Sequence, residues 1–401
     1  MTAILASTGK ALKILVLCDR FPYPLTNGQN LRIFNYVRLL KSTHSFDLLC
    51  YSDKPPPEEV TELFGNIETF PRPATVGAKG ARRLVESLDV TEFIPACEPV
   101  REELHRRTTG DHYDLIWVSG WDMIVNLPEG NRVPVLADAV DDGVLEWWRN
   151  LRQARGLASR LRSLKWLWMN ARFERRFFGA AQGVLFVAEP DAGVFRRIAP
   201  RTPTYVVHNG VDTDYFRPLG TPRQRDTLVF EGNMGFAPNV EAAVYFVRDV
   251  LPLIRKQRPV RLALVGIRPA PAVQALAGPD VEVTGVVDDV RPYLDRAAVF
   301  VCPMLSGAGI KNKILQAWAM GIPVVGTTAA TGGLAVRDGE NVLLGDTPQA
   351  LAAAVLRALE DSDLARRLGD GGRRTALEHY TWAAKARELE TVFERVAVSA
   401  T

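Results

Sequence analysis

The sequence is organised by short, continuous apolar runs, each followed by a loop and then by a stretch with helical periodicity. Continuous runs, as opposed to alternating apolar and polar residues, are typical of strands buried on both faces of a parallel sheet. The helical stretches provide the crossover connections that parallel strands require. In the first half of the chain these runs are 13–18, 46–51, 115–118, 134–137, 183–187 and 204–207.

The same pattern begins again at Thr227. No repeat of about 20–50 residues accompanies it, which argues against a solenoid and in favour of two doubly wound α/β halves. The length of 401 residues also suits two domains better than one hydrophobic core. The runs of the second half are 227–230, 261–266, 281–285, 299–303, 323–326 and the short run 343–344.

The boundary between the halves is predicted near 208–212, where Asn-Gly is a turn signal and the following stretch 217–222 has the composition of a linker. Ligands of open α/β sheets bind outside the carboxyl ends of the strands, so a cleft between the two domains is the predicted site. We predict a flexible leader, an N-terminal domain, a C-terminal domain and a C-terminal amphipathic helix. These segments are residues 1–12, 13–207, 208–381 and 382–401.

Composition and charge exclude several classes of protein. The net charge of +3 gives the whole chain no strong electrostatic signature, so any basic surface must be local. The four cysteines are scattered without a CxxC pair, which predicts buried free thiols and a reducing cytoplasm. No apolar run reaches the ~18 residues needed to span a bilayer, and the first residues lack the features of a signal peptide.

The stretch 306–328 combines a glycine-containing loop, a helix start with Lys311 and Lys313, and a buried strand. Lysines at a helix start oppose the helix dipole by up to ~1 kcal/mol. A bound anion would reverse this penalty, because the first amides of the helix and both ammonium groups would then face it. The alternative is a solvated lysine pair on an ordinary helix.

Several motifs resemble known enzymes. Asn209–Asp212 at the domain junction and the stretch 313–325 (KILQAWAMGIPVV) resemble the GT-B glycosyltransferases of the family-4 type. The stretches 230–239, 283–290 and 309–313 resemble an exopolysaccharide-associated subgroup of sugar transferases, the PEP-CTERM/EpsH type. The resemblance covers residues 13–396 and is strongest over 208–335.

This resemblance implies two Rossmann-like domains facing a cleft, with the C-terminal helix crossing back to the N-terminal domain. It implies a retaining hexosyltransferase that takes a sugar from a nucleoside diphosphate sugar, with UDP or GDP, and needs no other cofactor. The donor would bind the C-terminal domain, and a glycan, lipid-linked or small-molecule acceptor would bind the N-terminal domain. The alternatives are a non-catalytic GT-B protein that binds nucleotide sugar, and a nucleotide-sugar epimerase.

The chain departs from the family at two places. The two acidic residues of the family's donor helix fall on Ala308 and Gln316, of which only Gln316 can still hydrogen-bond a ribose. The basic residues of the family's first C-terminal loop are replaced by Asn233 and by Pro238–Asn239. We therefore expect Lys313, and secondly Lys311, to supply the charge for the diphosphate.

Further candidates follow strand ends. Gly28 and Gln29 lie in the first strand-to-helix loop, and the loop 331–334 matches the family's phosphate loop. Asp138 ends a strand and is a candidate for orienting the acceptor hydroxyl, while a helix N-cap is the alternative for Asp141 or Asp142. The predicted donor-binding residues are Gly28, Gln29, Asn233, Gly309, Lys311, Asn312, Lys313, Gln316, Thr331, Gly332, Gly333 and Leu334; the predicted catalytic residues are Asp138 and Lys313; the predicted acceptor-binding residues are Asp138 and Asp141.

Other polar residues are given structural interpretations. Arg32 is expected to face either the cleft or solvent, with solvent favoured. His208 is expected to form a structural hydrogen bond, and Asp288–Asp289 to cap a helix. Without a His pair or a Cys/His cluster, the sequence predicts no metal site.

The stretch 149–178 is basic and aromatic, with Glu174 as its single acidic residue. It is predicted to form a helix pair that rests on an anionic membrane surface, which would suit a lipid-linked acceptor and a peripheral position at the inner face of the cell membrane. Nucleic-acid binding is a weaker alternative because no nucleic-acid module accompanies the stretch. The third interpretation is a solvated arginine face with the aromatic side chains in the core.

Overall fold

The computed structural model describes residues 10–25, 27–73, 94–110, 113–154, 156–306 and 310–398. The chain divides into two compact units, which we call the N-terminal unit (1–208 with 385–401) and the C-terminal unit (209–384). Most of the predicted leader lies outside the described residues. At its end, Leu12 is buried and its N–H donates a hydrogen bond to Nδ1 of His44.

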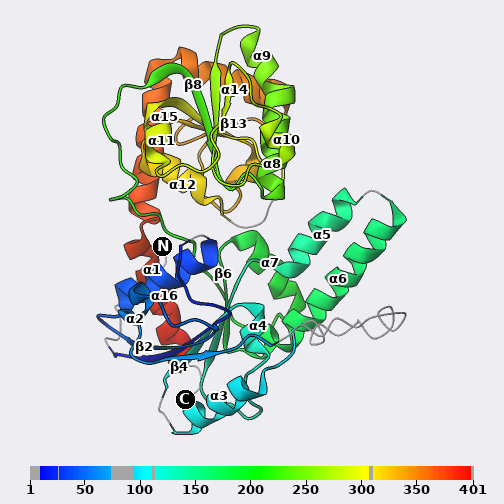
Figure 1. The fold of residues 1–401 in the computed structure, drawn as a ribbon, viewed down its shortest axis with the longest axis vertical. Coiled ribbons are helices and arrows are strands. Elements are labelled where there is room, and N and C mark those ends of the chain that lie inside the picture. Colours follow the sequence, from blue (N-terminus) through cyan, green and yellow to red (C-terminus); the bar gives the residue numbers. More distant parts are fainter. Residues whose placement is uncertain are drawn as a thin grey trace. The chain divides into compact units, whose positions relative to one another are not determined.

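In the described part of the N-terminal unit the strands form a seven-stranded parallel sheet in the order β3-β2-β1-β4-β5-β6-β7 (Figure 1). The six predicted runs all form strands. The additional strand β3 lies at the edge and is only half-buried, so it lacks the continuous apolar run of a strand covered on both faces. The strands are β1 (Lys13–Cys18), β2 (Ser45–Tyr51), β3 (Ile67–Phe70), β4 (Leu115–Ser119), β5 (Val135–Val140), β6 (Gly183–Phe186) and β7 (Thr204–Val206).

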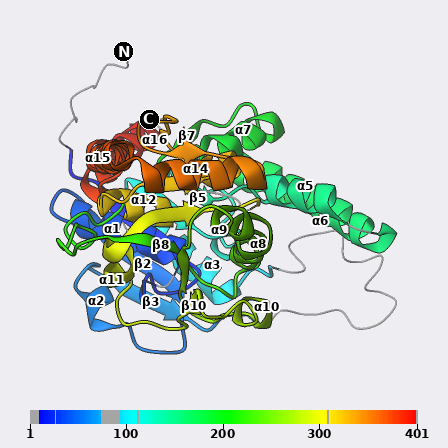
Figure 2. The same ribbon diagram turned by 90° about the horizontal axis from the view of Figure 1, so that it is seen from above.

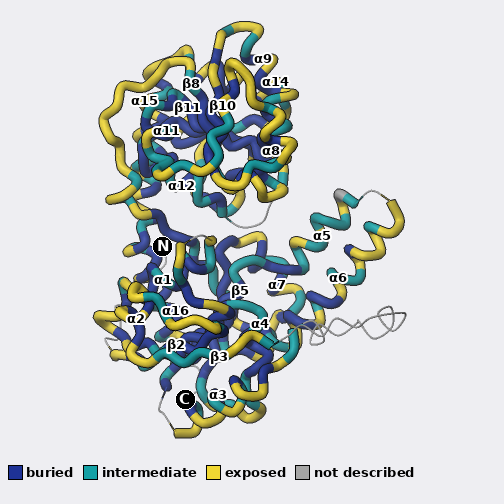
Figure 3. Tube along the Cα trace, viewed as in Figure 1, coloured by how far each residue is buried: buried dark blue, intermediate teal, exposed yellow. Residues whose placement is uncertain are grey.

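Helices cover this sheet, and the strands form its buried centre (Figure 3). The helices α5 and α6 pack side by side as a hairpin, which is visible in two perpendicular views (Figures 1 and 2). The helices are α1 (Gly28–Leu40), α2 (Glu58–Thr61), α3 (Glu98–Gly110), α4 (Trp121–Ile124), α5 (Gly143–Gln153), α6 (Leu157–Arg176), α7 (Glu189–Ile198) and α16 (Trp382–Val398), the last of which belongs to this unit from Lys385 onward.

The described part of the C-terminal unit has a six-stranded parallel sheet in the order β10-β9-β8-β11-β12-β13. Figure 1 shows α8 and α9 on one side of it and α11 and α15 on the other. The strands are β8 (Gln224–Glu231), β9 (Arg261–Val265), β10 (Val281–Val283), β11 (Ala297–Cys302), β12 (Val324–Gly326) and β13 (Leu343–Leu344). The helices are α8 (Ala237–Tyr245), α9 (Leu251–Arg255), α10 (Pro271–Gln274), α11 (Arg291–Arg296), α12 (Asn312–Ala319), α13 (Thr328–Thr331), α14 (Pro348–Glu360) and α15 (Ser362–His379).

These two sheets confirm the predicted class of two doubly wound α/β domains. The four cysteines are free and buried, as predicted. In the described part of the chain, no helix is long and apolar enough to cross a bilayer.

Parallel register brings the loops that carry polar residues to one edge of each sheet. In the N-terminal unit Ser119 pairs with both Cys18 and Asp138, so the residues after β1, β4 and β5 emerge together. In the C-terminal unit Glu231 pairs with Val265, which places Gly232 against Gly266. A Cβ on Gly266 would lie 1.8 Å from the carbonyl oxygen of Gly232, so this close approach requires glycine.

Candidate functional site

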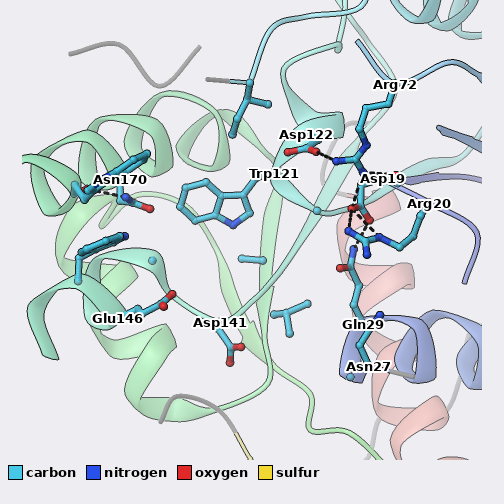
Figure 4. Close-up of a pocket in the computed structure, with 18 residues that line it drawn as sticks. Asp19, Arg20, Asn27, Gln29, Arg72, Trp121, Asp122, Asp141, Glu146 and Asn170 are labelled. Atoms are coloured by element: carbon cyan, nitrogen blue, oxygen red, sulfur yellow. Dashed lines mark hydrogen bonds and ion pairs between the residues drawn. The ribbon is translucent and has the colours of Figure 1, made fainter. Parts of the chain in front are cut away.

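A cavity of about 830 Å³ lies at the carboxyl edge of the N-terminal sheet. The loops after β1, β4 and β5 surround it, and the start of α1 together with α5 and α6 completes its wall. We call it the N-terminal pocket; Figure 4 shows its lining side chains. Its position is the one at which open α/β sheets bind their ligands.

One wall of the pocket is a charged network centred on Asp19. Oδ2 of Asp19 lies 2.6 Å from Nη2 of Arg20 and 3.0 Å from Nη2 of Arg72. Nη1 of Arg72 also lies 2.8 Å from Oδ2 of Asp122. Nε2 of Gln29 donates to Oδ1 of Asp19 over 3.3 Å. Both guanidinium groups are therefore already paired with carboxylates of the pocket (Figure 4).

The opposite wall is aromatic. Trp121 stacks on Phe173 with ring centroids 4.6 Å apart, and Trp147 stacks on Trp166 at 5.6 Å. The first residue of α5 must be small here, because a Cβ on Gly143 would lie 2.6 Å from the Trp121 ring. Trp121, Trp147 and Trp166 are each partly exposed, so ring surface remains at the pocket.

Asp138 does not line the pocket. Its side chain is completely buried, and its Oδ2 lies 2.7 Å from Nε of the equally buried Arg32. Nη1 of Arg32 also donates to the carbonyl oxygen of Val207. Burial raises the pKa of Asp138, while Arg32 opposes that rise. The prediction that Arg32 faces solvent is therefore wrong. The carboxylate of Asp138 is buried in an ion pair with Arg32 and is not exposed to an acceptor.

Of the neighbouring carboxylates, Asp141 lines the pocket and Asp142 caps α5. The N–H of Leu145 donates to Oδ1 of Asp142 over 2.6 Å, which is the N-cap alternative that the sequence offered. The N–H of Gly143 donates to Oε1 of Glu174 over 3.0 Å. Burial raises the pKa of Asp142 to about 7 and the pKa of Glu174 well above its usual range, and the charge of Asp142 adds to the rise for Glu174.

In the C-terminal unit, Lys313 lies at the carboxyl edge of the sheet. Its Nζ donates to Oδ1 of Asn239 over 2.8 Å and lies 4.4 Å from the ring centroid of Phe230. A Cβ on Gly232 would lie 2.6 Å from this Nζ, so bare backbone covers the amine. Burial lowers the pKa of Lys313, although Cys302 and Glu231 oppose the shift. Burial likewise raises the pKa of Glu231.

Asn239 connects Lys313 to the loop after β8. While its Oδ1 accepts from Lys313, its Nδ2 donates to the carbonyl oxygen of Asn233 over 2.9 Å. Oδ1 of Asn233 in turn accepts from the N–H of Gly235. Asn239 stands at one of the positions where the resemblance expects a basic residue, and it binds the ammonium group that α12 supplies.

Three further predicted donor-binding residues, Lys311, Asn312 and Gln316, lie in or next to α12. Lys311 is buried at the N-cap position, and its charge, like that of Lys313, lowers the pKa of Cys302 against the effect of burial. Within the described residues the buried Oδ1 of Asn312 accepts no hydrogen bond. Gln316 is partly exposed on the second turn, and Gly309 lies outside the described residues.

The predicted phosphate loop, residues 331–334, contains both groups that form internal hydrogen bonds and exposed glycines. The hydroxyl of Thr331 donates within its own turn, and the N–H of Leu334 donates to the carbonyl oxygen of Thr331. Gly332 is exposed, and Gly333 has a φ of 83°, a conformation that favours glycine. The part of this loop open to a ligand is therefore Gly332–Gly333.

Gly28 and Gln29, predicted to bind the donor, line the N-terminal pocket. The prediction for His208 is confirmed, since its Nδ1 lies 2.6 Å from the carbonyl oxygen of Val187. Asp289 accepts from the N–H of Arg291 beside the start of α11. Among the described residues, no group of three or more His, Cys, Asp or Glu side chains is arranged to hold a metal ion.

The sequence reasoning did not identify Asp19, Trp121 or Asp122 as site residues. Asp19 directly follows the predicted run 13–18, and Trp121 and Asp122 lie three and four residues after the run 115–118, so the rule that selected Asp138 could also have selected them. Arg72 and Asn170 had no such signal, because they come from a segment after an edge strand and from the middle of α6.

Comparisons with known proteins show similarity to glycosyltransferases. Residues 225–361 match the family model described as Glycosyl transferases group 1. The phosphatidyl-myo-inositol mannosyltransferase of Mycobacterium tuberculosis is 30% identical over 208 residues, which are 48% of this chain and 54% of that protein. The chain thus spans about half the length of this curated relative.

The likeness to solved structures extends over nearly the whole chain. Sucrose-phosphate synthase from Thermosynechococcus elongatus has a TM-score of 0.69 at 19% identity, covering 97% of this chain and 100% of that one. Anabaena HepE, crystallised with UDP and glucose, has a TM-score of 0.65 at 16% identity, covering 96% and 99%. The fold is therefore the predicted GT-B fold, and the resemblance to glycosyltransferases is confirmed for residues 225–361.

Proposed function

We propose that this protein is a hexosyltransferase, which moves a sugar from a nucleoside diphosphate sugar to an acceptor hydroxyl with retention and without a metal ion or other cofactor. The observation that carries the proposal is the ammonium group of Lys313, partly desolvated at the carboxyl edge of the C-terminal sheet. It lies within the segment that matches the group 1 glycosyltransferases.

The environment of Lys313 favours an anionic ligand. Burial disfavours its charged form, and the acceptor of its hydrogen bond, Oδ1 of Asn239, carries no charge. A diphosphate would add acceptors that are themselves anionic, and hydrogen bonds between an ammonium group and a phosphate are stronger. Lys311, the loop 232–235 and the amides of Gly332–Gly333 would bind the same group, and Gln316 would bind the ribose. HepE was crystallised with UDP, which makes UDP the first nucleotide to test and GDP the second.

In the proposed reaction the bond between the sugar and the diphosphate breaks, the acceptor hydroxyl oxygen forms the new glycosidic bond, and the hydroxyl proton passes to the departing diphosphate. Negative charge develops on the departing diphosphate, where Lys313 and the loop amides stabilise it. This charge compensation is the basis for expecting no metal requirement. The acceptor is assigned to the N-terminal pocket, a cavity of about 830 Å³ at the carboxyl edge of that sheet.

A second candidate is a GT-B protein that binds a nucleotide sugar without turnover. It is motivated by Ala308 and Gln316, which replace the two carboxylates that the resemblance expects. An epimerase is less favoured: among the described acidic side chains, Glu231 is the one whose charge is found to act on Lys313.

A panel of UDP and GDP sugars separates these candidates. We expect at least one donor to raise the melting temperature and to release its nucleoside diphosphate when acceptors are added, with activity retained in EDTA. Thermal stabilisation with no release for any donor and acceptor would favour the non-catalytic candidate. Activity lost in EDTA and restored by Mg²⁺ or Mn²⁺ would overturn metal independence. We assign the exopolysaccharide-associated subgroup as part of this proposal, on the motifs at 230–239 and 283–290.

We also propose that the α5–α6 hairpin binds the anionic inner face of the cell membrane. Leu157, Leu161, Leu164 and Trp168 follow one face of α6 and are 74%, 56%, 48% and 43% exposed. Exposed basic side chains accompany them, and an apolar face with a basic surround fits an anionic lipid surface. The exposed basic residues are Arg152, Arg160, Arg162, Arg172, Arg175 and Arg176.

A further inference from the structure

We infer that the N-terminal pocket accepts an uncharged sugar ring and discriminates against phosphorylated sugars and uronates. This inference rests on the proposed function, because it names the chemical class of the acceptor. It is carried by three properties of the pocket: its charge, its aromatic wall and its size.

The charge of the lining disfavours an anion. The described lining residues include four carboxylates and two guanidinium groups. Both guanidinium groups are engaged, since Arg20 pairs with Asp19 while Arg72 pairs with Asp19 and Asp122. A phosphate or carboxylate on the ligand would have to share a guanidinium group with a carboxylate that already pairs with it. That carboxylate would lie beside the ligand's anion and repel it.

The second pair of carboxylates strengthens this discrimination. Asp141 and Glu146 lie on the side of the pocket formed by the end of β5 and the start of α5, and Figure 4 shows them across the pocket from Arg20 and Arg72. An ionised carboxylate only accepts hydrogen bonds, so it suits sugar hydroxyls as donors and repels a second anion. Anions are thus disfavoured at both ends of the pocket.

The aromatic wall suits the apolar face of a sugar ring. In Figure 4 Trp121 lies between Glu146 on one side and the network of Arg72 and Asp122 on the other. Phe173 stacks on one face of its ring. Its other face and the partly exposed Trp147 offer flat apolar surface beside hydrogen-bonding groups. Pockets that combine such apolar surface with a few polar groups fix both the position and the orientation of a ligand.

The volume of about 830 Å³ is near the upper part of the range for small-molecule sites, roughly 300–1,000 Å³. It leaves room for more than a single ring. The inferred ligand is therefore the neutral end of an oligosaccharide or glycoside.

Ligand-observed NMR on the full chain, without donor, tests the inference. Each neutral probe is paired with its charged counterpart: methyl glucoside with glucose 6-phosphate and glucuronate, methyl mannoside with mannose 6-phosphate, and maltose and cellobiose as larger neutral probes. We expect saturation transfer to at least one neutral probe, and charged counterparts at least about tenfold weaker. Binding of none of the neutral probes, or tighter binding of a charged counterpart, overturns the inference.

Charge reversal at the pocket provides a second readout. We expect Glu146→Lys to narrow the preference for neutral over phosphorylated sugar by about tenfold or more, because it replaces repulsion by attraction. Glu360→Lys makes the same change of net charge at an exposed position of α14 and should leave the preference unchanged. Equal effects of the two variants would show that net charge, and not the pocket, sets the preference.

Different results would contradict the proposed transferase activity and the inferred specificity of the pocket. Neutral sugars that bind while every donor fails to react would retain the pocket assignment and remove the transferase activity. Transfer to phosphorylated acceptors in preference to neutral ones would retain the activity and remove this inference.

Discussion

The Nζ of Lys313 donates a hydrogen bond over 2.8 Å to Oδ1 of Asn239, and the same Asn239 side chain donates to the carbonyl oxygen of Asn233. A lysine of α12 is thereby attached to the loop that precedes α8. The resemblance expects basic residues in that loop. In this chain the positive charge comes instead from Lys313 of α12, and the side chain of Asn239 positions it.

Replacing this lysine tests the donor site. We expect Lys313→Ala to weaken binding of UDP or GDP about tenfold or more, which corresponds to about 1.4 kcal/mol, because a charge-assisted contact is lost. Calorimetric titration of the nucleoside diphosphate measures the change. The control is Lys256→Ala, which removes the same charge from an exposed position of the same unit. Unchanged affinity in Lys313→Ala would refute the assignment.

The partner of Lys313 gives a separate prediction. Asn239→Ala removes the acceptor for Nζ and the donor to Asn233, so we expect weaker nucleotide binding and a loss of about 1–3 kcal/mol in the free energy of unfolding. Asn239→Asp keeps an acceptor for Nζ and the size of the side chain but places a carboxylate beside the expected phosphate, so it should also bind nucleotide more weakly than wild type. Tighter binding by the Asp variant would contradict a phosphate at this position.

The ion pair of Arg32 with Asp138 is predicted to matter for stability. Removing one partner leaves the other buried and uncompensated, at a cost of about 3–5 kcal/mol. Urea denaturation should therefore show a large loss for Asp138→Leu and recovery of part of it in the double variant Arg32→Met/Asp138→Leu. A folded Asp138→Asn variant with wild-type stability and no transfer would instead support the catalytic role that the sequence suggested.

The buried carboxyls of Asp142 and Glu174 predict a dependence of stability on pH. Their pKa values are raised in the folded state, so the folded protein binds more protons than the unfolded chain between about pH 4, the usual range, and the raised values. Stability is therefore lost as pH rises through this window. The raised pKa of about 7 for Asp142 places much of the loss below neutrality.

We expect the difference in melting temperature between Glu174→Gln and wild type to favour the variant more at pH 8 than at pH 5. Glutamine can still accept the hydrogen bond from Gly143 but does not ionise. Glu378→Gln, at an exposed position of α15, serves as the control and should follow wild type at both values. An equal offset of Glu174→Gln at the two pH values would disprove the linkage.

Membrane binding is tested by vesicle flotation. The wild-type chain should float with vesicles that contain anionic phospholipid, less so at high salt, and not with neutral vesicles. The double variant Leu161→Glu/Leu164→Glu should lose this binding, whereas Leu377→Glu, at an exposed leucine of α15, should keep it. Binding of single-stranded or duplex nucleic acid in place of vesicles would favour the alternative interpretation of the basic stretch.

The sequence alone predicted the two doubly wound domains, because strands buried on both faces require continuous apolar runs and such runs are visible without a structure. The edge strand β3 escaped this reasoning since it is half-buried. The basic start of α12 was also visible, because Lys311 and Lys313 violate a local preference of helices.

Tertiary structure decided which polar side chains share a surface. Asp138 and Asp19 both follow the strand-end rule, yet Asp138 points at Arg32 inside the unit whereas Asp19 belongs to the pocket. No local pattern distinguishes them, because Asp138 meets Arg32, and Asp19 meets Arg72, only through contacts between segments far apart in the chain. Arg72 meets Asp19 across a sequence separation of 53 residues. Local patterns thus determine strands and their edges, while packing between distant segments determines the pocket.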